Sequence, residues 1–465
     1  MKGHRSTARR IAGHARVPIL ALIVLATAAV LAAPAGALPV PVNDPIFTAT
    51  VAGDGNAYDS YTALALNHDG SLFSCGYVYR DATGDNATIT RWDDAPDGWS
   101  REWDGPAHRA DTATDVVVAP AGPVYVTGVT QNAAGNNDVL LLKYSQAGTL
   151  QWWRKWAGPS SSWEAGLKVA VDSSGNILVA GSRRAHASSG IIKMVLVKYA
   201  PSGNLIWERE FSRASTNLVL HDFCLDASGN AYLVGQASTA SAEWGVIVRY
   251  THSGVHSWTR YYAGSFHGDN SFAAVCRSPL GGVYVVGSAA AESSTTDALV
   301  VRYTAAGSRT LTQRLGTGDS KSQWLDDVAV DHSGRIAVCG SWQNVDPDFY
   351  VAVLTTAGVP VWSQSYDGGY GMPDEANALI VDASNCVCAA GVSEEDPDVS
   401  RTLVYAFSTA GDPRWRSSWP TSATGAASVR DIAAYHSSNV WTCGSSYTGV
   451  DRGSDQLLLG WNLLH

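Results

Sequence analysis

The sequence predicts an all-β fold, an eight-bladed β-propeller of four-stranded antiparallel blades. The first observation behind this prediction is an internal repeat of about fifty residues, clearest as Tyr144, Gly148 and Trp152 spaced four positions apart. The same register recurs, with substitutions in the last two copies: Tyr199, Gly203, Trp207; Tyr250, Gly254, Trp258; Leu354, Gly358, Trp362; Phe407, Gly411, Trp415. Such a period indicates one supersecondary unit used many times.

The second observation is a glycine that closes a short apolar run and marks every repeat. It falls at eight positions: Gly76, Gly128, Gly181, Gly235, Gly287, Gly340, Gly391 and Gly444. The gaps between them are 52, 53, 54, 52, 53, 51 and 53 residues. The marker therefore predicts eight repeats, which leave little of the chain for a second domain.

Each repeat reads as four strands in succession. The first two runs, as in 167–182, are rich in β-branched and apolar residues and are joined by Asp-x-Ser-Gly-Asn, a turn sequence whose glycine can take positive φ. The third run, as in 195–199, ends at the Tyr of the repeat, and a second glycine turn leads to a fourth run that starts at the Trp. No sustained helical period follows residue 40, so we expect antiparallel meanders.

The third observation is that the two ends of the chain complement each other. The last repeat contains three predicted strands, 429–434, 440–444 and 456–461, and no fourth. The segment 46–53 has the spacing of a fourth strand, because Phe47 lies six residues before Gly53 as Trp152 lies six before Gly158. We expect this N-terminal strand to complete the last blade, which would remove two exposed sheet edges.

The first 37 residues predict an export signal. A basic start is followed by an apolar core at 17–33 and by the small residues Ala35, Gly36 and Ala37 of a cleavage site. We expect a signal peptide at 1–37, a short linker at 38–45 and one propeller at 46–465, in a protein that is secreted, periplasmic or on the cell surface. The alternative is an uncleaved membrane anchor, which the short apolar stretch and Pro18 disfavour.

The charge of the exported part limits its partners. Removing residues 1–37 takes away 5 of the 32 basic residues and none of the 42 acidic ones, so the net charge is 27 minus 42, or −15. An acidic surface disfavours nucleic acid and anionic lipid. We expect a monomer with no membrane insertion after signal removal, whose partner is a protein or polysaccharide of the cell envelope.

The unit 225–264 carries a family resemblance. It combines the Asp-x-Ser-Gly-Asn turn, an apolar run to Gly235 and the strand ending at Arg249 and Tyr250 before a glycine turn. These elements resemble the bacterial β-propeller repeat of exported proteins, the SBBP repeat, over nearly everything from residue 47 onward. The resemblance implies a secreted or surface propeller and no particular activity.

The Tyr-x-x-x-Gly-x-x-x-Trp element also resembles the tryptophan-docking repeat of the pyrroloquinoline-quinone-like propeller family. The enzymes of that family have vicinal cysteines and a calcium-bound cofactor, and this chain has no Cys-Cys pair. A quinone-type redox protein is therefore only a third hypothesis. The resemblance implies structural docking between blades, with each indole N–H near a carbonyl of its neighbour, for Trp152, Trp207, Trp258, Trp362 and Trp415.

Four aspartates share one register, seven residues before the turn, in alternate repeats: Asp115, Asp222, Asp327 and Asp431. If they line the mouth of a central channel, their carboxylates could bind a sugar or hold calcium, the one candidate cofactor. The alternative, which we favour, is that each carboxylate accepts backbone N–H groups of the loop leading into its own strand.

Four tryptophans outside the docking register are expected to lie in or beside the loops that join second to third strands. Flat rings there could stack on sugars or anchor a partner protein, and the alternative for two or three of them is packing between blades. These candidate binding residues are Trp163, Trp244, Trp324 and Trp342.

The sequence contains no recognisable catalytic motif and predicts no catalytic residue. The preferred hypothesis is a non-enzymatic exported scaffold that binds a protein or polysaccharide through its loops. The alternative is a propeller enzyme, a polysaccharide lyase or hydrolase, with the four carboxylates at the channel mouth and with calcium as a candidate requirement.

Overall fold

The structure is a computed structural model that describes residues 44–462, except 55–56, 93–97, 121, 160–161, 186–189, 265–267, 269, 292–294, 317–320, 370, 397–398, 421–424, 436–438 and 448–453. The expected export signal lies outside the described residues. Leu38–His465 forms one compact unit. Every regular element in the described ranges is a strand, and none of their residues forms a helix that could span a membrane.

Six sheets have four strands each, paired in chain order. The first three are β2 (Ser60–Leu66), β3 (Leu72–Arg80), β4 (Gly84–Trp92) and β5 (Trp99–Trp103); β6 (Asp111–Val118), β7 (Val124–Gln131), β8 (Asn137–Tyr144) and β9 (Leu150–Trp156); and β10 (Trp163–Val171), β11 (Ile177–Arg184), β12 (Ile192–Tyr199) and β13 (Leu205–Phe211). The next three are β14 (Asn217–Leu225), β15 (Ala231–Ser238), β16 (Glu243–Tyr250) and β17 (His256–Tyr262); β18 (Ser271–Arg277), β19 (Val283–Ala290), β20 (Thr296–Tyr303) and β21 (Arg309–Leu315); and β22 (Gln323–Val330), β23 (Ile336–Gln343), β24 (Pro347–Leu354) and β25 (Pro360–Tyr366).

The remaining strands form an eight-stranded sheet made of two antiparallel groups of four. One group is β26 (Asp374–Val381), β27 (Val387–Asp396), β28 (Val399–Phe407) and β29 (Pro413–Trp419). The other is β30 (Gly425–Tyr435), β31 (Asn439–Tyr447), β32 (Asp455–Asn462) and β1 (Phe47–Val51). A short parallel pairing of β28 with β30 joins the two groups.

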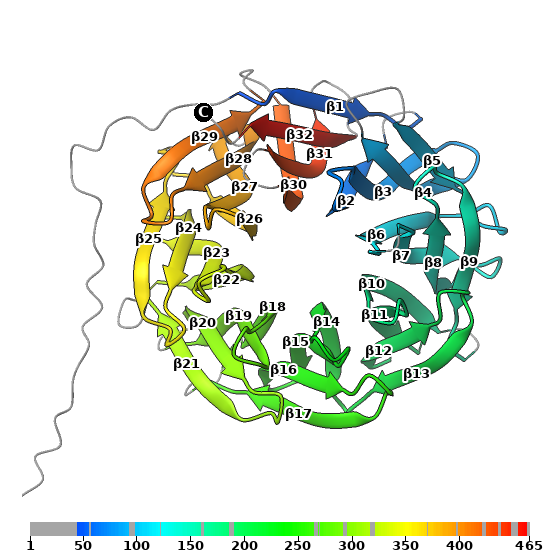
Figure 1. Ribbon diagram of the computed structural model, residues 1–465, viewed down its shortest axis with the longest axis horizontal. Helices are drawn as coiled ribbons and strands as arrows, with labels where there is room; N and C mark the ends of the chain where they lie inside the picture. Colours follow the sequence, from blue (N-terminus) through cyan, green and yellow to red (C-terminus); the bar gives the residue numbers. More distant parts are fainter. Residues whose placement is uncertain are drawn as a thin grey trace, which may run out of the picture. The chain divides into compact units, whose positions relative to one another are not determined.

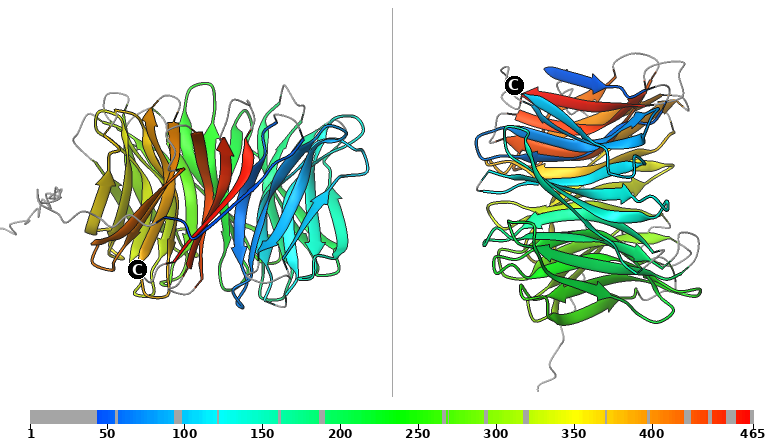
Figure 2. Two further views of the ribbon diagram at one scale, coloured as in Figure 1. Left: turned by 90° about the horizontal axis from the view of Figure 1, so that it is seen from above. Right: turned by 90° about the vertical axis from the view of Figure 1, so that its right-hand side faces the viewer.

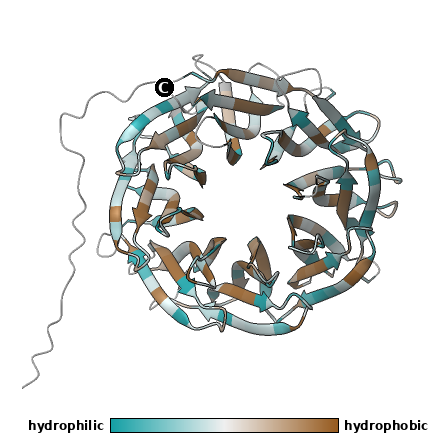
Figure 3. Cartoon of the chain, viewed as in Figure 1, coloured by the Kyte–Doolittle hydropathy of each residue, from teal (hydrophilic) through white to brown (hydrophobic). Residues whose placement is uncertain are grey.

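Within the unit Leu38–His465, the sheets follow one another around a ring, with first strands innermost and fourth strands outermost (Figure 1). Seen from the side, the sheets stand next to one another with their strands crossing the thickness of the ring (Figure 2). Second and third strands are the most buried, whereas the fourth strand β13 alternates exposed and half-buried residues. The outermost strands of the ring also carry more hydrophilic residues than the strands inside them (Figure 3). Apolar clusters lie between neighbouring sheets, as where Tyr232 and Val234 of β15 meet Val283 and Val285 of β19. This burial is the main stabilising term of the ring.

A β-bulge in every first strand explains the marker glycines. In β14 the register shifts between Leu220 and Asp222, and Gly235 of β15 pairs with Leu220. A Cβ atom on Gly235 would lie 2.0 Å from the carbonyl oxygen of Val219, and the other seven marker glycines meet the equivalent oxygen at 1.8–2.1 Å. Each marker glycine is therefore required because the bulged strand approaches its Cα too closely for any side chain.

The strand β1 pairs antiparallel with β32, from Phe47 opposite Gly460 to Val51 opposite Gln456. The Phe47 ring packs edge-on against Trp92 and Trp441, with centroids 5.8 and 5.5 Å apart. The described N-terminal strand thus lies on the edge of the last three strands of the chain.

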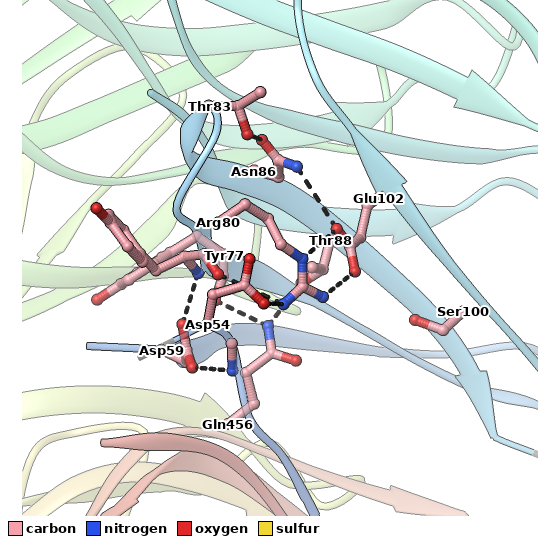
Figure 4. Close-up of polar contacts among 12 residues, drawn as sticks. Asp54, Asp59, Tyr77, Arg80, Thr83, Asn86, Thr88, Ser100, Glu102 and Gln456 are labelled. Atoms are coloured by element: carbon pink, nitrogen blue, oxygen red, sulfur yellow. Dashed lines mark hydrogen bonds and ion pairs between the residues drawn. The ribbon is translucent and has the colours of Figure 1, made fainter. Parts of the chain in front are cut away.

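Polar contacts fasten this junction to the sheet β2–β5 (Figure 4). The Gln456 amide of β32 donates to the carbonyl oxygen of Tyr77, at 2.9 Å, and to the hydroxyl of Thr88, at 2.8 Å. Arg80 binds Asp54, just after β1, and Glu102 of β5. Because β2 also contacts β30 and β31, the first complete sheet packs against the last.

Candidate functional site

The antiparallel order gives the ring two different faces. First and third strands begin, and second and fourth strands end, at one face, which we term the loop face because the longer connections lie there. The opposite face, termed the turn face, carries the tight turns between first and second strands and between third and fourth strands.

The four predicted aspartates lie midway along the innermost strands and immediately after the bulge, not at the loop-face ends of these strands. One carboxylate oxygen of each accepts a backbone N–H from the first strand of the next sheet in the ring. The four bonds are Val169 N–H to Asp115 (2.7 Å), Val275 N–H to Asp222 (2.9 Å), Leu379 N–H to Asp327 (2.8 Å) and Leu64 N–H to Asp431 (2.7 Å). The carboxylates therefore link neighbouring sheets, whereas the sequence suggested a bond within the loop of the same strand.

The position after the bulge alternates around the ring. The aspartates occupy alternate sheets, and the sheets between them carry Ala63, Lys168, Ala274 and Ala378 at this position. Lys168 departs from the alanine pattern, and the pKa of its ammonium is raised by the carboxylate of Asp115 above all and by the other three aspartates. The positions after the bulge thus combine four carboxylates with one lysine around the ring.

Burial acts against ionisation of these carboxylates. It raises the pKa of Asp115 to about 6, although Lys168 and the Val169 N–H oppose the shift. It raises the pKa of Asp327 to about 7, and the pKa values of Asp222 and Asp431 are also raised by burial. These side chains are half-buried, so solvent in the channel screens part of the effect.

A different set of polar residues fixes the loops that lead into the first strands. A glycine N–H donates to the side chain six residues later: Gly53 to Asp59, Gly105 to Asp111, Gly264 to Asn270 and Gly368 to Asp374. The four side chains are at most 2% exposed. We did not predict these residues from the sequence, although the Gly-x5-Asp/Asn spacing was a signal that could have identified them.

The docking tryptophans lie on the fourth strands and meet the turn of the next sheet. Trp152 donates its indole N–H to the carbonyl oxygen of Pro201 (3.3 Å), Trp258 to that of Ala305 (3.0 Å) and Trp362 to that of Thr409 (3.3 Å). Trp415 instead is buried against Trp461 at 6.4 Å between ring centroids. Trp207 approaches Gly254 so closely that a Cβ there would lie 2.8 Å from its ring.

An arginine two residues after the tryptophan completes this contact, and sequence reasoning missed it. Arg260 donates through Nε to the carbonyl oxygen of Gly307 at 2.9 Å, and its guanidinium lies 5.4 Å from the Trp258 ring centroid. Equivalent bonds and ring contacts are made by Arg101, Arg154 and Arg209. The recurring Trp-x-Arg spacing was the available signal.

The four candidate binding tryptophans all lie at the loop-face ends of their strands, but they differ in packing. Trp244 and Trp342 pack against the apolar clusters between sheets, and the Trp342 ring lies 4.9 Å from that of Tyr350. Trp324 lies beside Asp326, the carboxyl whose pKa burial raises to about 7. Trp163 begins β10, and its indole N–H donates to the amide oxygen of Asn136 at 3.2 Å.

Trp163 lines a cavity. The cavity has a volume of about 200 Å³ and is bounded also by Asn137, Glu164, Arg183, Arg184 and Ile192. Arg183 lies 3.5 Å from Glu164 and also binds Glu210 of β13. The cavity therefore combines an aromatic edge with guanidinium and amide groups. Among the described side chains, no three His, Cys, Asp or Glu residues are grouped so as to hold a metal ion.

Comparisons with known proteins bear on the fold. No protein-family model matches the sequence, and no curated protein matches it significantly. Among solved structures, Sqt1 from Chaetomium thermophilum is similar with a TM-score of 0.56 and 13% identity, over 90% of this chain and 99% of that one. The WD40 domain of SCAP from fission yeast has a TM-score of 0.42 and 9% identity, over 91% and 96%. The likeness to Sqt1, at 13% identity, shows the fold alone, an all-β propeller of repeated four-stranded antiparallel sheets.

Proposed function

We propose that this protein is an exported, non-enzymatic propeller of eight blades, related to the SBBP-type repeat proteins, that binds a protein or polysaccharide of the cell envelope through its loop face. The observation that carries this proposal is the cavity at Trp163, where an aromatic edge and two arginines lie together at the loop face. Aromatic and arginine side chains dominate the binding energy of protein surfaces, and aromatic rings also stack on sugars.

Two further observations support parts of this proposal. Eight sets of four strands, the last completed by β1, support eight blades closed by the N-terminal strand. The bonds between Asp115, Asp222, Asp327 and Asp431 and backbone N–H groups support a non-enzymatic role, because they commit these carboxylates to joining sheets. The lyase or hydrolase alternative would need at least one of them free to exchange protons with a substrate.

The proposal is tested with residues 38–465 on a glycan array and in a pull-down from cell-envelope extract. We expect a ligand or partner whose binding Trp163→Ala weakens at least tenfold. The matched control is Leu280→Ala, which removes an exposed apolar side chain on the turn face. Equal binding by both variants would contradict a loop-face site, and release of sugar products that Asp115→Asn abolishes would establish the enzyme instead.

A further inference from the structure

A recess on the turn face lies between the sheets β2–β5 and β6–β9. It consists of two cavities of about 410 Å³ each that share His68 and Pro120. One is bounded mainly by Gly122, Pro123, Ser145, Gln146 and Gln151, and the other by Leu66, Asn67, Val118 and Ala119. The size of each is typical of a small-molecule site.

One of the turns that line this recess departs from the repeat. In the turn after β10, Asp172 accepts the N–H groups of Ser174 and Asn176 through one oxygen, both at 2.9 Å, and binds the Lys198 ammonium through the other at 2.8 Å. The turn after β6 has the same backbone bonds, from Ala119 N–H to Pro123 and from Gly122 N–H to Ala119. Its residues Ala119 and Pro123 lack the two polar side chains that Asp172 and Asn176 supply in the β10–β11 turn, and both line the recess.

The recess also contains a buried hydrogen-bond donor without a partner in the protein. Asn67 is 5% exposed, and its amide oxygen accepts the N–H of His68 at 2.8 Å, which fixes the orientation of the amide. The Nδ2 atom has no hydrogen-bond partner. The equivalent residue of four other turns is an aspartate that accepts backbone N–H groups, whereas Asn67 also carries a donor. A ligand oxygen that reached Nδ2 would satisfy this buried donor.

We propose that this recess binds a neutral sugar unit of a polysaccharide. Its polar side chains are amides, a hydroxyl and an imidazole, which both donate to and accept from sugar hydroxyls. The rings of Pro120 and Pro123 offer apolar surface to the C–H face of a sugar. Among the described residues that bound the two cavities, none is Lys, Arg, Asp or Glu, which favours a neutral ligand. This site is separate from the proposed loop-face site, and neither depends on the other.

The test uses maltohexaose, cellohexaose and chitohexaose as probes, with decaproline as a peptide probe, in calorimetric titrations of residues 38–465. The principal variant is Ala119→Asp with Pro123→Asn, which restores the side chains of the β10–β11 turn and gives Lys143, now bonded to Pro201, an aspartate partner. We expect a hexasaccharide to bind and this variant to weaken binding at least tenfold while its melting temperature is unchanged or higher.

Two further variants separate the outcomes. Asn67→Asp exchanges the donor for an acceptor in the same volume and should also weaken sugar binding tenfold. Trp163→Ala changes only the loop face, so it should leave this binding unchanged. The proposal is overturned if no hexasaccharide binds, if only decaproline binds, or if binding survives in the filled turn. Loss of binding in Trp163→Ala alone would support the loop-face site and overturn this one.

Discussion

The cost of adding one methyl group differs sharply between two kinds of glycine in this chain. At Gly235 the backbone is extended, but the added carbon would lie 2.0 Å from the Val219 oxygen. At Gly281 the carbon would meet nothing within 4 Å, but φ is +79°. The first case is a collision between two backbones that neither strand can relieve, whereas the second is only a conformational preference.

We therefore predict that Gly235→Ala destabilises the protein by more than about 3 kcal/mol or prevents folding. Gly281→Ala, the control, should lower the free energy of unfolding by only about 1 kcal/mol. Urea unfolding followed by tryptophan fluorescence measures both. If both variants lose the same free energy of unfolding, the bulged strand can move away from Gly235, and the close approach described above does not require glycine there.

The pKa values of the ring carboxylates predict a pH dependence of stability. Asp327 holds its proton to about pH 7 in the folded protein, because burial raises its pKa from the ordinary 3.8. The unfolded chain releases that proton near pH 4, so the folded state binds more protons between pH 4 and 7. This contribution to the free energy of unfolding is present below pH 4 and is lost as pH rises through 7.

We predict that Asp327→Asn reduces the loss of stability between pH 5 and pH 8 by about 2 kcal/mol relative to the unmodified protein, after allowance for solvent screening. The amide oxygen of asparagine can still accept the Leu379 N–H. Urea midpoints at both pH values give the result, and Asp412→Asn at an exposed turn is the control. An unchanged pH dependence in Asp327→Asn would mean that the carboxyl ionises at its ordinary pKa.

The register of the four aspartates could be predicted from the sequence, but their partners could not. Spacing places Asp115 on the innermost strand, whereas its bond to Val169 depends on how the next sheet leans against it, which involves residues 54 positions away. The buried loop residue Asp111 shows the opposite case, since its partner Gly105 is only six residues away. The Gly-x5-Asp spacing could have predicted that bond, but we used the spacing of residues only to predict strands.

At the scale of the element, the fourth strand of one sheet and the third-to-fourth turn of the next form a repeated clamp. The Tyr and Gly of several repeats receive the Trp of the preceding repeat, as Tyr303 and Gly307 receive Trp258, whereas Gly358 meets Leu311. In the Tyr-x-x-x-Gly-x-x-x-Trp element, the Tyr and Gly therefore contact the preceding sheet, and the Trp contacts the following sheet. One element thus contributes to two different interfaces. The strands can be predicted from alternating hydrophobicity. The arginine bond could not be predicted in this way, because it forms only between two sheets that already pack together.

We predict that Arg260→Ala lowers the free energy of unfolding by about 2 kcal/mol, because it removes a charged hydrogen bond to Gly307 and a cation–π contact with Trp258. Arg260→Lys should recover less than half of this loss, since an ammonium cannot repeat the planar geometry. Arg277→Ala, at an exposed strand end, is the control. Full recovery by lysine would show that the charge alone stabilises the clamp.

At the scale of the whole molecule, both ends of the described chain lie at one junction, where β1 pairs with β32 and β2 contacts β30. Carboxylate bonds across sheets join β6 to β10, β14 to β18, β22 to β26 and β30 to β2, so the last of them spans the junction of the chain ends. The junction has in addition the β1–β32 pairing and the Gln456 contacts. It is therefore held by both kinds of interaction, within a sheet and between sheets.

The last prediction concerns the edge that β1 covers. Removing residues 38–51 leaves β32, whose residues Gln456 to Trp461 are buried, with an unpaired backbone edge. An apolar strand with a free edge pairs with other chains, so the truncated protein should form oligomers at micromolar concentration and unfold at a lower temperature.

A synthetic peptide of residues 44–53 should restore the monomer, and the same peptide with Phe47→Ala should do so less well, because Phe47 packs between Trp92 and Trp441. Size-exclusion chromatography with light scattering distinguishes these states. A truncated protein that stays monomeric with an unchanged melting temperature would mean that the ring holds without its first strand, and that the contacts of β2 with β30 and β31 suffice to close it.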